Sequence, residues 1–178
     1  MSTNLLVTGP PRSDKTTVVR RAEDRLASRG YQAGGIFCPQ LRSDGERVGF
    51  EIVDLTTGEA RTLAHVDREE GPTVGEYRVN VEGIGSICAA AFVRAFDDAD
   101  VLIVDEIAPM EVYSDEFVRQ VRRGLDSDHP LVAAVHHRSR EGFIGEVKAR
   151  DDAEMFEVTD STRDDLPGQL TERVIGGL

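Results

Sequence analysis

The sequence contains no tryptophan, only two cysteines and no hydrophobic run of the roughly 20 residues that a membrane-spanning helix needs. We therefore expect a soluble protein. Cys38 and Cys88 lie far apart and show no CxxC or Cys/His spacing, which argues against a disulfide framework or a zinc site and favours buried free thiols. The first ten residues lack the basic segment of a signal peptide, so the sequence predicts a cytoplasmic protein.

Lysine is equally scarce, since only Lys15 and Lys148 are lysines among 21 cationic residues, and the net charge is -12. A dense carboxylate surface stays hydrated in concentrated salt, where charge repulsion is screened over about 3 Å at 1 M. This composition predicts a halophilic source, with an ordinary acidic cytosolic protein as the alternative. Neither interpretation predicts a nucleic-acid partner, because a phosphate backbone is repelled by an acidic surface.

The 178 residues suit one domain spanning the whole chain, 1–178. Apolar segments of strand and helix length alternate, which predicts an α/β fold with a parallel core sheet and helices on its faces. Residues 47–64 instead predict an inserted β-hairpin with its turn at Thr57-Gly58. The predicted strands are 5–7, 32–37, 101–104, 131–135 and 155–158, and the predicted helices are 16–28, 82–96, 114–124, 141–150 and 165–174.

A phosphate-binding loop is indicated by GPPRSDKTT, residues 9–17, which stands between the first strand and the first helix as a Walker A motif does. Lys15 falls where a compact ammonium must reach the β- and γ-phosphates, in a chain that otherwise uses arginine. The hydroxyl of Thr16 is predicted to join a Mg²⁺ shell, and main-chain N–H groups of residues 10–16 to hold the phosphates. The alternative is a strand-turn-helix with an incidental lysine. The predicted nucleotide-binding residues here are Gly9, Pro10, Pro11, Arg12, Ser13, Asp14, Lys15, Thr16 and Thr17.

Asp14 stands where the Walker A consensus has glycine. Its side chain crowds the approach of the backbone to phosphate, and its charge repels a triphosphate by roughly 4 kcal/mol at about 4 Å and an effective dielectric constant near 20. We predict weakened rather than abolished binding. A side chain that turns outward or holds a metal remains an alternative.

The second motif is VLIVDEIAPMEV, residues 101–112, an apolar strand followed by two acids in a Walker B pattern. Asp105 is predicted to bind the Mg²⁺ hydration shell, and Glu106 to orient or deprotonate the attacking water. Together with Lys15 they form the predicted catalytic set. Two solvated acids at a strand end are the alternative.

The chain resembles a family of small P-loop nucleoside-triphosphatases from thermophiles and animals, which includes the cancer-related nucleoside-triphosphatase. The resemblance rests on GPPRSDKTT, RSDGERVGFEIVDLTTGE (42–59), VGEYRVNVE (74–82), DEIAPME (105–111) and VTDSTRDDL (158–166). It implies a three-layer α/β/α fold similar to nucleotide kinases, with a five-stranded parallel core and extra strands. It also implies slow hydrolysis of ATP, GTP and other triphosphates to diphosphate and phosphate with Mg²⁺.

The chain departs from the family pattern at four positions. Arg12 and Asp14 replace glycines, Ala108 replaces another glycine, and Thr162 replaces an asparagine. By resemblance to nucleotide kinases, Arg163 is predicted to stack on the base, with a solvated loop arginine as the alternative.

Four further residues are candidates for phosphate contacts. Arg42 and Arg47 match an arginine-bearing hairpin of the family, and a guanidinium there would stabilise charge on the γ-phosphate. His136 and His137 follow a predicted strand, where α/β proteins collect ligand groups. For all four, ordinary surface pairing or local hydrogen bonding is the alternative.

Two other functions stay open beside hydrolysis. The altered phosphate loop is compatible with a nucleotide-binding protein that has lost turnover. A kinase for a small molecule or a nucleotide is less favoured, because no arginine-rich lid segment is evident in the sequence.

Overall fold

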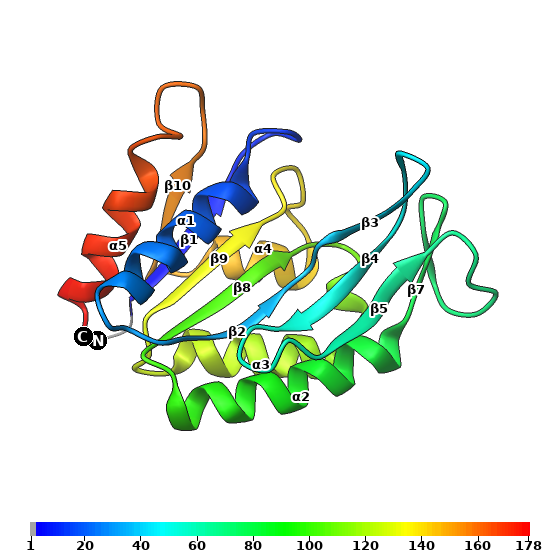
Figure 1. Cartoon of the computed structure of the whole chain (residues 1–178), viewed down its shortest axis with the longest axis horizontal. Coiled ribbons are helices and arrows are strands. Elements are labelled where there is room, and N and C mark those ends of the chain that lie inside the picture. The colour runs from blue at the N-terminus through cyan, green and yellow to red at the C-terminus, as the bar shows by residue number, and fades with distance from the viewer. Residues whose placement is uncertain (1–2) are drawn as a thin grey trace.

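Strands and helices alternate along most of the chain in the computed structural model, which describes residues 3–178 (Figure 1). The strands are β1 (Asn4–Thr8), β2 (Ala33–Phe37), β3 (Gln40–Ser43), β4 (Glu46–Asp54), β5 (Ala60–His65), β6 (Thr73–Val74), β7 (Tyr77–Val79), β8 (Val101–Ile107), β9 (Leu131–Val135) and β10 (Ala153–Glu157). The helices are α1 (Lys15–Ser28), α2 (Val81–Asp98), α3 (Asp115–Asp126), α4 (Gly142–Lys148) and α5 (Leu166–Gly176), with a short 3-10 helix at Glu111–Tyr113.

One sheet joins all the strands in the order β10-β1-β9-β8-β2-β4-β5-β7-β6, and β3 pairs with β4. The five strands from β10 to β2 are parallel, whereas every pairing from β2–β4 onward is antiparallel. The predicted parallel core and the hairpin at 47–64, which is β4–β5, are thus confirmed. The short strands β3, β6 and β7 were not predicted, because two to four residues carry too little periodicity to detect.

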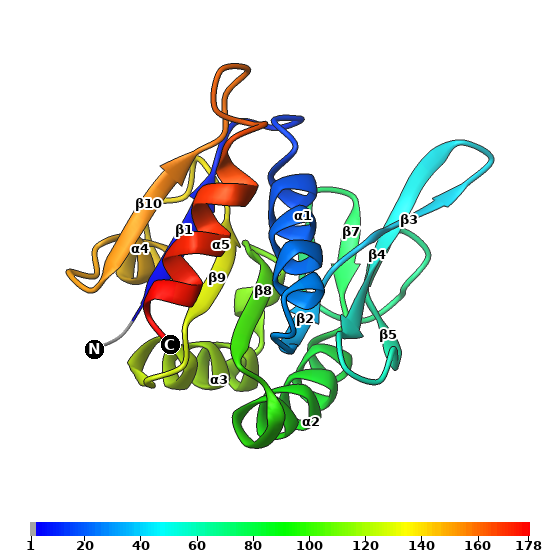
Figure 2. The same ribbon diagram turned by 60° about the vertical axis from the view of Figure 1, so that its left-hand side comes forward.

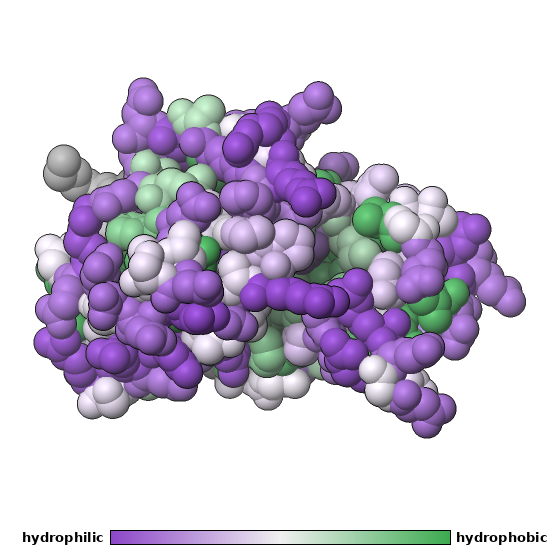
Figure 3. Space-filling model, turned by 90° about the horizontal axis from the view of Figure 1, so that it is seen from above, coloured by the Kyte–Doolittle hydropathy of each residue, from purple (hydrophilic) through white to green (hydrophobic). Residues whose placement is uncertain are grey.

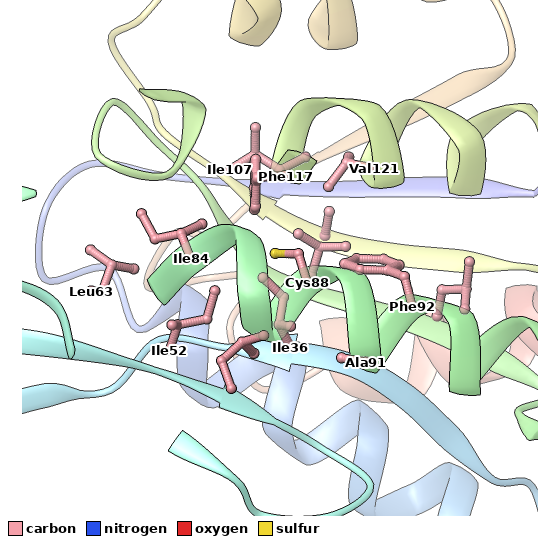
Figure 4. Close-up of a cluster of buried hydrophobic side chains, with 14 of the residues drawn as sticks. Ile36, Ile52, Leu63, Ile84, Cys88, Ala91, Phe92, Ile107, Phe117 and Val121 are labelled. Atoms are coloured by element: carbon pink, nitrogen blue, oxygen red, sulfur yellow. The ribbon is translucent and has the colours of Figure 1, made fainter. Parts of the chain in front are cut away.

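The side chains of the parallel strands alternate between two cores, as the twofold period of a strand requires. Leu5 and Val7 pack with α1 and α5 on one face, whereas Leu6 packs with α2, α3 and α4 on the other. Figures 1 and 2 show the two helical layers on opposite sides of the sheet. Figure 4 shows part of the larger core, in which Phe92 and Phe117 lie among aliphatic side chains. The fold is therefore the predicted three-layer α/β/α arrangement.

The predicted helix positions agree with the structure to within three residues at each end, and side-chain caps mark the starts of two helices. Ser114 accepts a hydrogen bond from the N–H of Phe117 at the start of α3, and Asn80 accepts one from Gly83 at the start of α2. The expectation of two buried thiols is half wrong. Cys88 is buried in the core, whereas Cys38, just beyond β2, packs against that core but is partly exposed.

The described part of the chain contains no helix long and apolar enough to cross a membrane. Figure 3 views the molecule along the sheet from the side where the parallel strands end. This face is mainly hydrophilic, with a few small hydrophobic areas. The candidate site lies on this side.

Candidate active site

The phosphate loop and the acidic end of β8 meet at the carboxyl edge of the parallel sheet (Figure 1). The loop follows β1, and one strand, β9, separates β1 from β8. Parallel strands that end at the same edge place their following loops together, which is where α/β proteins bind ligands.

Two neighbouring residues of α1 bridge this gap to two neighbouring residues of β8. Lys15 Nζ donates a hydrogen bond to Glu106 Oε2 over 3.0 Å, and the Thr16 hydroxyl donates to Asp105 Oδ1 over 3.3 Å. The structure therefore brings together the four residues that the two motifs had singled out. Their roles in chemistry stay predictions.

Both acids reach the site because β8 is irregular where they lie. In a regular strand, consecutive side chains point to opposite faces of the sheet. The register between β8 and β9 shifts here, since Asp105 pairs with Ala134 and Ile107 pairs with Val135, leaving Glu106 as the extra residue. Such a bulge redirects side chains. It accounts for two consecutive acids contacting two consecutive residues of α1, and it corrects the expectation that both acids lie beyond the strand.

The phosphate loop leaves little room for a side chain at its first position, and its backbone is left-handed at two later positions. A side chain on Gly9 would place its Cβ 2.4 Å from Ser13 Oγ. Arg12 and Asp14 instead adopt φ values of 66° and 72°. These left-handed conformations favour glycine, so both residues carry side chains on a backbone that suits the glycines of the family pattern.

The prediction that main-chain N–H groups of residues 10–16 hold the phosphates is narrowed by the loop itself. Pro10 and Pro11 have no N–H to donate, and the N–H of Ser13 already donates to the carbonyl of Pro10 over 3.1 Å. The first turn of α1 still offers N–H groups without intrahelical partners. The predicted phosphate contacts of the main chain are thus left to the N–H groups of Asp14 and the residues that follow it, together with Arg12.

Asp14 turns away from the helix that it begins. Its side chain makes no capping hydrogen bond to α1 but accepts one from Arg163 Nη1 over 2.9 Å. Arg163 Nη2 also donates to Asp160 Oδ1 over 3.3 Å. Of the alternatives for Asp14, the outward orientation is the one found. Arg163, for which contact with the base was predicted, is bound to the phosphate loop.

Two carboxyl groups of the DEIAPME segment are buried, and each is 4% exposed. Burial, reinforced by the charge of Glu106, raises the pKa of Asp105 to about 7, although the Thr16 hydrogen bond opposes this. Burial likewise raises the pKa of Glu111 to about 8, with Glu106 adding to the effect and a hydrogen bond with Cys38 opposing it. Glu111 was not among the predicted site residues. Its place in the segment that carries the resemblance was the available signal.

The loop after β9 lies beside the phosphate loop. His136 Nδ1 lies 2.7 Å from Ser139 Oγ, and His137 Nδ1 lies 3.4 Å from Thr8 Oγ1. Lys148 donates to the carbonyls of His137 and Ser139 over 3.0 and 2.7 Å. Sequence reasoning missed Lys148, although its rarity as one of two lysines was a signal. Partial burial, together with the charges of Arg140 and Lys15, lowers the pKa of Lys148.

The two hairpin arginines are engaged elsewhere. Arg42 and Arg47 pair across the β3–β4 hairpin. Arg42 donates to the carbonyl of Gly45, and Arg47 Nε donates to the hydroxyl of Tyr77 over 3.0 Å. Neither is brought to the phosphate loop in this structure, which accords with ordinary local pairing.

A cavity of about 680 Å³ opens between the segment after β8 and the loop after β9. Pro109, Val112 and Tyr113 line one side, and Arg138 and Arg140 line the other. The sequence shows no arginine-rich lid segment, and the lining of this cavity includes none of Lys15, Thr16, Asp105 and Glu106. Kinase activity stays a hypothesis.

The fold and the paired motifs define a P-loop protein of the nucleoside-triphosphate-binding class. The sequence profile of a family described as NTPase matches residues 4–171, and the chain belongs to this family. The nucleoside-triphosphatase THEP1 of Methanopyrus kandleri is 42% identical over 176 residues, covering 98% of this chain and 97% of the relative. That of Thermofilum pendens is 41% identical over 172 residues, covering 96% and 94%.

Two solved structures share the fold over nearly the whole chain. THEP1 of Aquifex aeolicus superposes with a TM-score of 0.84 at 28% identity and covers 98% of this chain and 99% of its own. A human cancer-related nucleoside triphosphatase superposes with a TM-score of 0.82 at 26% identity and covers 98% of each chain. The resemblance stated from the sequence and the predicted fold are thereby confirmed.

Proposed function

We propose that this protein hydrolyses nucleoside triphosphates to diphosphate and phosphate. The observation that carries the proposal is the double bridge from α1 to β8, in which Lys15 contacts Glu106 and Thr16 contacts Asp105. Family membership and the names of the relatives support the same reaction. ATP and GTP are the proposed substrates.

In the proposed mechanism, phosphate oxygens compete with Glu106 for the ammonium of Lys15. The two side chains form an ion pair, 16% and 32% exposed respectively. When a triphosphate takes over Lys15, the carboxylate of Glu106 is freed to hold a water molecule in line with the γ-phosphorus. The water oxygen bonds to phosphorus, the bond from phosphorus to the β,γ-bridging oxygen breaks, and the water proton passes to Glu106.

The donor set fits Mg²⁺, since Thr16 and Asp105 offer two oxygen atoms 3.3 Å apart, and hard divalent cations prefer oxygen ligands. Within residues 3–178, no three His, Cys, Asp or Glu side chains gather into a metal site of their own. This suits an ion that is held largely by water and by the substrate's phosphates. When bound, Mg²⁺ would neutralise charge that develops on the phosphate oxygens.

The test is phosphate release from Mg·ATP and Mg·GTP by the wild-type protein, with Glu106→Gln as the matched control. We expect release by the wild type well above that of the variant. Nucleotide binding without release would identify the alternative, a binding protein that has lost turnover. No binding of either nucleotide would overturn the assignment altogether.

A further inference from the structure

The contact between Asp14 and Arg163 joins two loops that are 149 residues apart in the sequence. Asp14 lies in the phosphate loop, and Arg163 lies in the loop between β10 and α5. Figures 1 and 2 both show these loops side by side at the edge where the parallel strands end. The contact therefore adds a side-chain link between two segments that already meet where β10 ends, since the N–H of Val158 donates to the carbonyl of Thr8 over 2.8 Å.

The loop that carries Arg163 is held in shape by its own hydrogen bonds. The Thr162 hydroxyl donates to the carbonyl of Glu157 over 2.8 Å and accepts from the N–H of Thr159, also over 2.8 Å. The N–H of Arg163 donates to the carbonyl of Thr159 over 3.0 Å. Arg163 is thus presented to Asp14 from a braced loop.

Asp14 is bound to Arg163 instead of serving its own helix. Aspartate at the start of a helix usually accepts a hydrogen bond from the first turn, but Asp14 makes no such bond. Its carboxylate is drawn toward Arg163, although its main chain belongs to the phosphate loop. The pairing accounts for how a negative charge is accommodated where several phosphate charges are proposed to bind.

We propose that Arg163 is a positioning residue that neutralises Asp14 and holds its carboxylate away from the phosphates. This inference rests on the proposed function, because it specifies how the phosphate site tolerates aspartate in place of glycine. Without Arg163, the carboxylate is free to move toward the phosphates and repel them. When Asp14 is absent, Arg163 is paired only with Asp160. Removing Arg163 from such a protein should then have little effect on the phosphate site.

A double-mutant cycle tests this role. The proteins are the wild type, Asp14→Gly, Arg163→Gln and the double variant, and the probes are inorganic tripolyphosphate and a non-hydrolysable ATP analogue, each with Mg²⁺. In the wild-type background, Arg163→Gln should weaken both probes about tenfold at low salt, because an unpaired carboxylate then repels them. In the Asp14→Gly background, the same change should alter affinity less than about twofold.

Two further variants control for charge. Arg163→Lys should restore most of the lost affinity, because a cation again faces Asp14. Arg122→Gln removes an equal charge from an exposed pair with Glu146, 3.0 Å long and on another part of the surface, and should leave affinity unchanged. Thermal unfolding of each variant verifies that it is folded.

The outcomes distinguish a positioning role for Arg163 from direct contact with the nucleotide. Equal losses in both backgrounds would overturn the proposal, because Arg163 would then act independently of Asp14. A loss for the ATP analogue alone, with tripolyphosphate unaffected, would also overturn it and would assign Arg163 to the base. If no variant binds either probe, Asp14→Gly included, the proposed function itself fails. If the effects of Asp14→Gly and Arg163→Gln on affinity simply add in the double variant, only the proposed coupling of Asp14 with Arg163 fails, and the proposed function stands.

Discussion

The two halves of the candidate site hold their charges in different surroundings. Asp14 in the phosphate loop has a side chain that is 47% exposed, and it is paired with Arg163. Asp105 and Glu111, in and after β8, are each 4% exposed. Water and the paired arginine compensate the charge on the exposed half, whereas burial of the other half disfavours ionisation. An exposed, paired carboxylate can therefore stand where the family pattern has glycine, at position 14. A buried carboxyl group, by contrast, is costly to ionise.

The largest effect should come from Glu106, where the halves meet. Glu106→Gln keeps the shape of the side chain but removes the base, so hydrolysis should fall about 10³-fold. Binding of Mg·ATP should persist or tighten, because the amide no longer pairs with the charge of Lys15. Turnover by phosphate release and affinity by titration calorimetry give the two readouts. Equal turnover in both proteins would remove Glu106 from the mechanism.

The buried half of the site should make the unfolding free energy depend on pH. The pKa of Glu111 in the folded protein is about 8, above its usual value of 4.5. A carboxyl group whose pKa is raised by folding contributes its whole stabilisation of the folded state below pH 4.5. That contribution is lost progressively as the pH rises from 4.5 through 8. Between pH 5 and 8.5 in Mg²⁺-free buffer, the wild type should lose about 4 kcal/mol more unfolding free energy than Glu111→Gln.

The control for this measurement is Glu76→Gln, which alters an exposed carboxylate in the turn between β6 and β7. Its unfolding free energy should depend on pH as that of the wild type does. The same pH slope in the wild type and Glu111→Gln would show that Glu111 ionises without penalty, and the contrast between the two halves would then be lost.

On the phosphate-loop side, Lys15→Ala should weaken triphosphate binding about 100-fold, because a charge-assisted contact to the phosphates is lost. The fold should remain, since the Lys15 ammonium contacts Glu106 at the site and not the hydrophobic core. Far-ultraviolet circular dichroism and nucleotide titration measure the two properties. Unchanged affinity in a folded variant would refute the phosphate-loop assignment.

The smallest effect is expected at the exposed position where Arg163 already compensates. Asp14→Gly should tighten Mg·ATP binding severalfold, because glycine suits a φ of 72° and removes a negative charge. The gain should shrink as salt rises if charge dominates and persist if backbone fit dominates. Dissociation constants across a salt series distinguish the two causes. No gain at any salt concentration would mean that Asp14 is fully accommodated.

The sequence by itself was sufficient for the parallel core and for the residues with fixed motif spacing. Buried strands such as β8 and β9 are apolar runs of strand length, and both were recognisable as such. Lys15 and Thr16 stand at set distances from Gly9 because the loop chemistry depends on local geometry. Local rules carried these predictions, so no knowledge of distant contacts was needed.

Only the tertiary structure decided the partners and the burial of the side chains in the site. The bulge at Glu106 depends on the pairing of β8 with β9, which the order of residues in β8 does not encode locally. The burial of Glu111 depends on the elements that surround it. The contact of Asp14 with Arg163 joins segments that approach only because β1 and β10 are neighbours in the sheet. Charge effects depend on distance and burial in three dimensions, so the state of the site followed from the fold and not from the motifs.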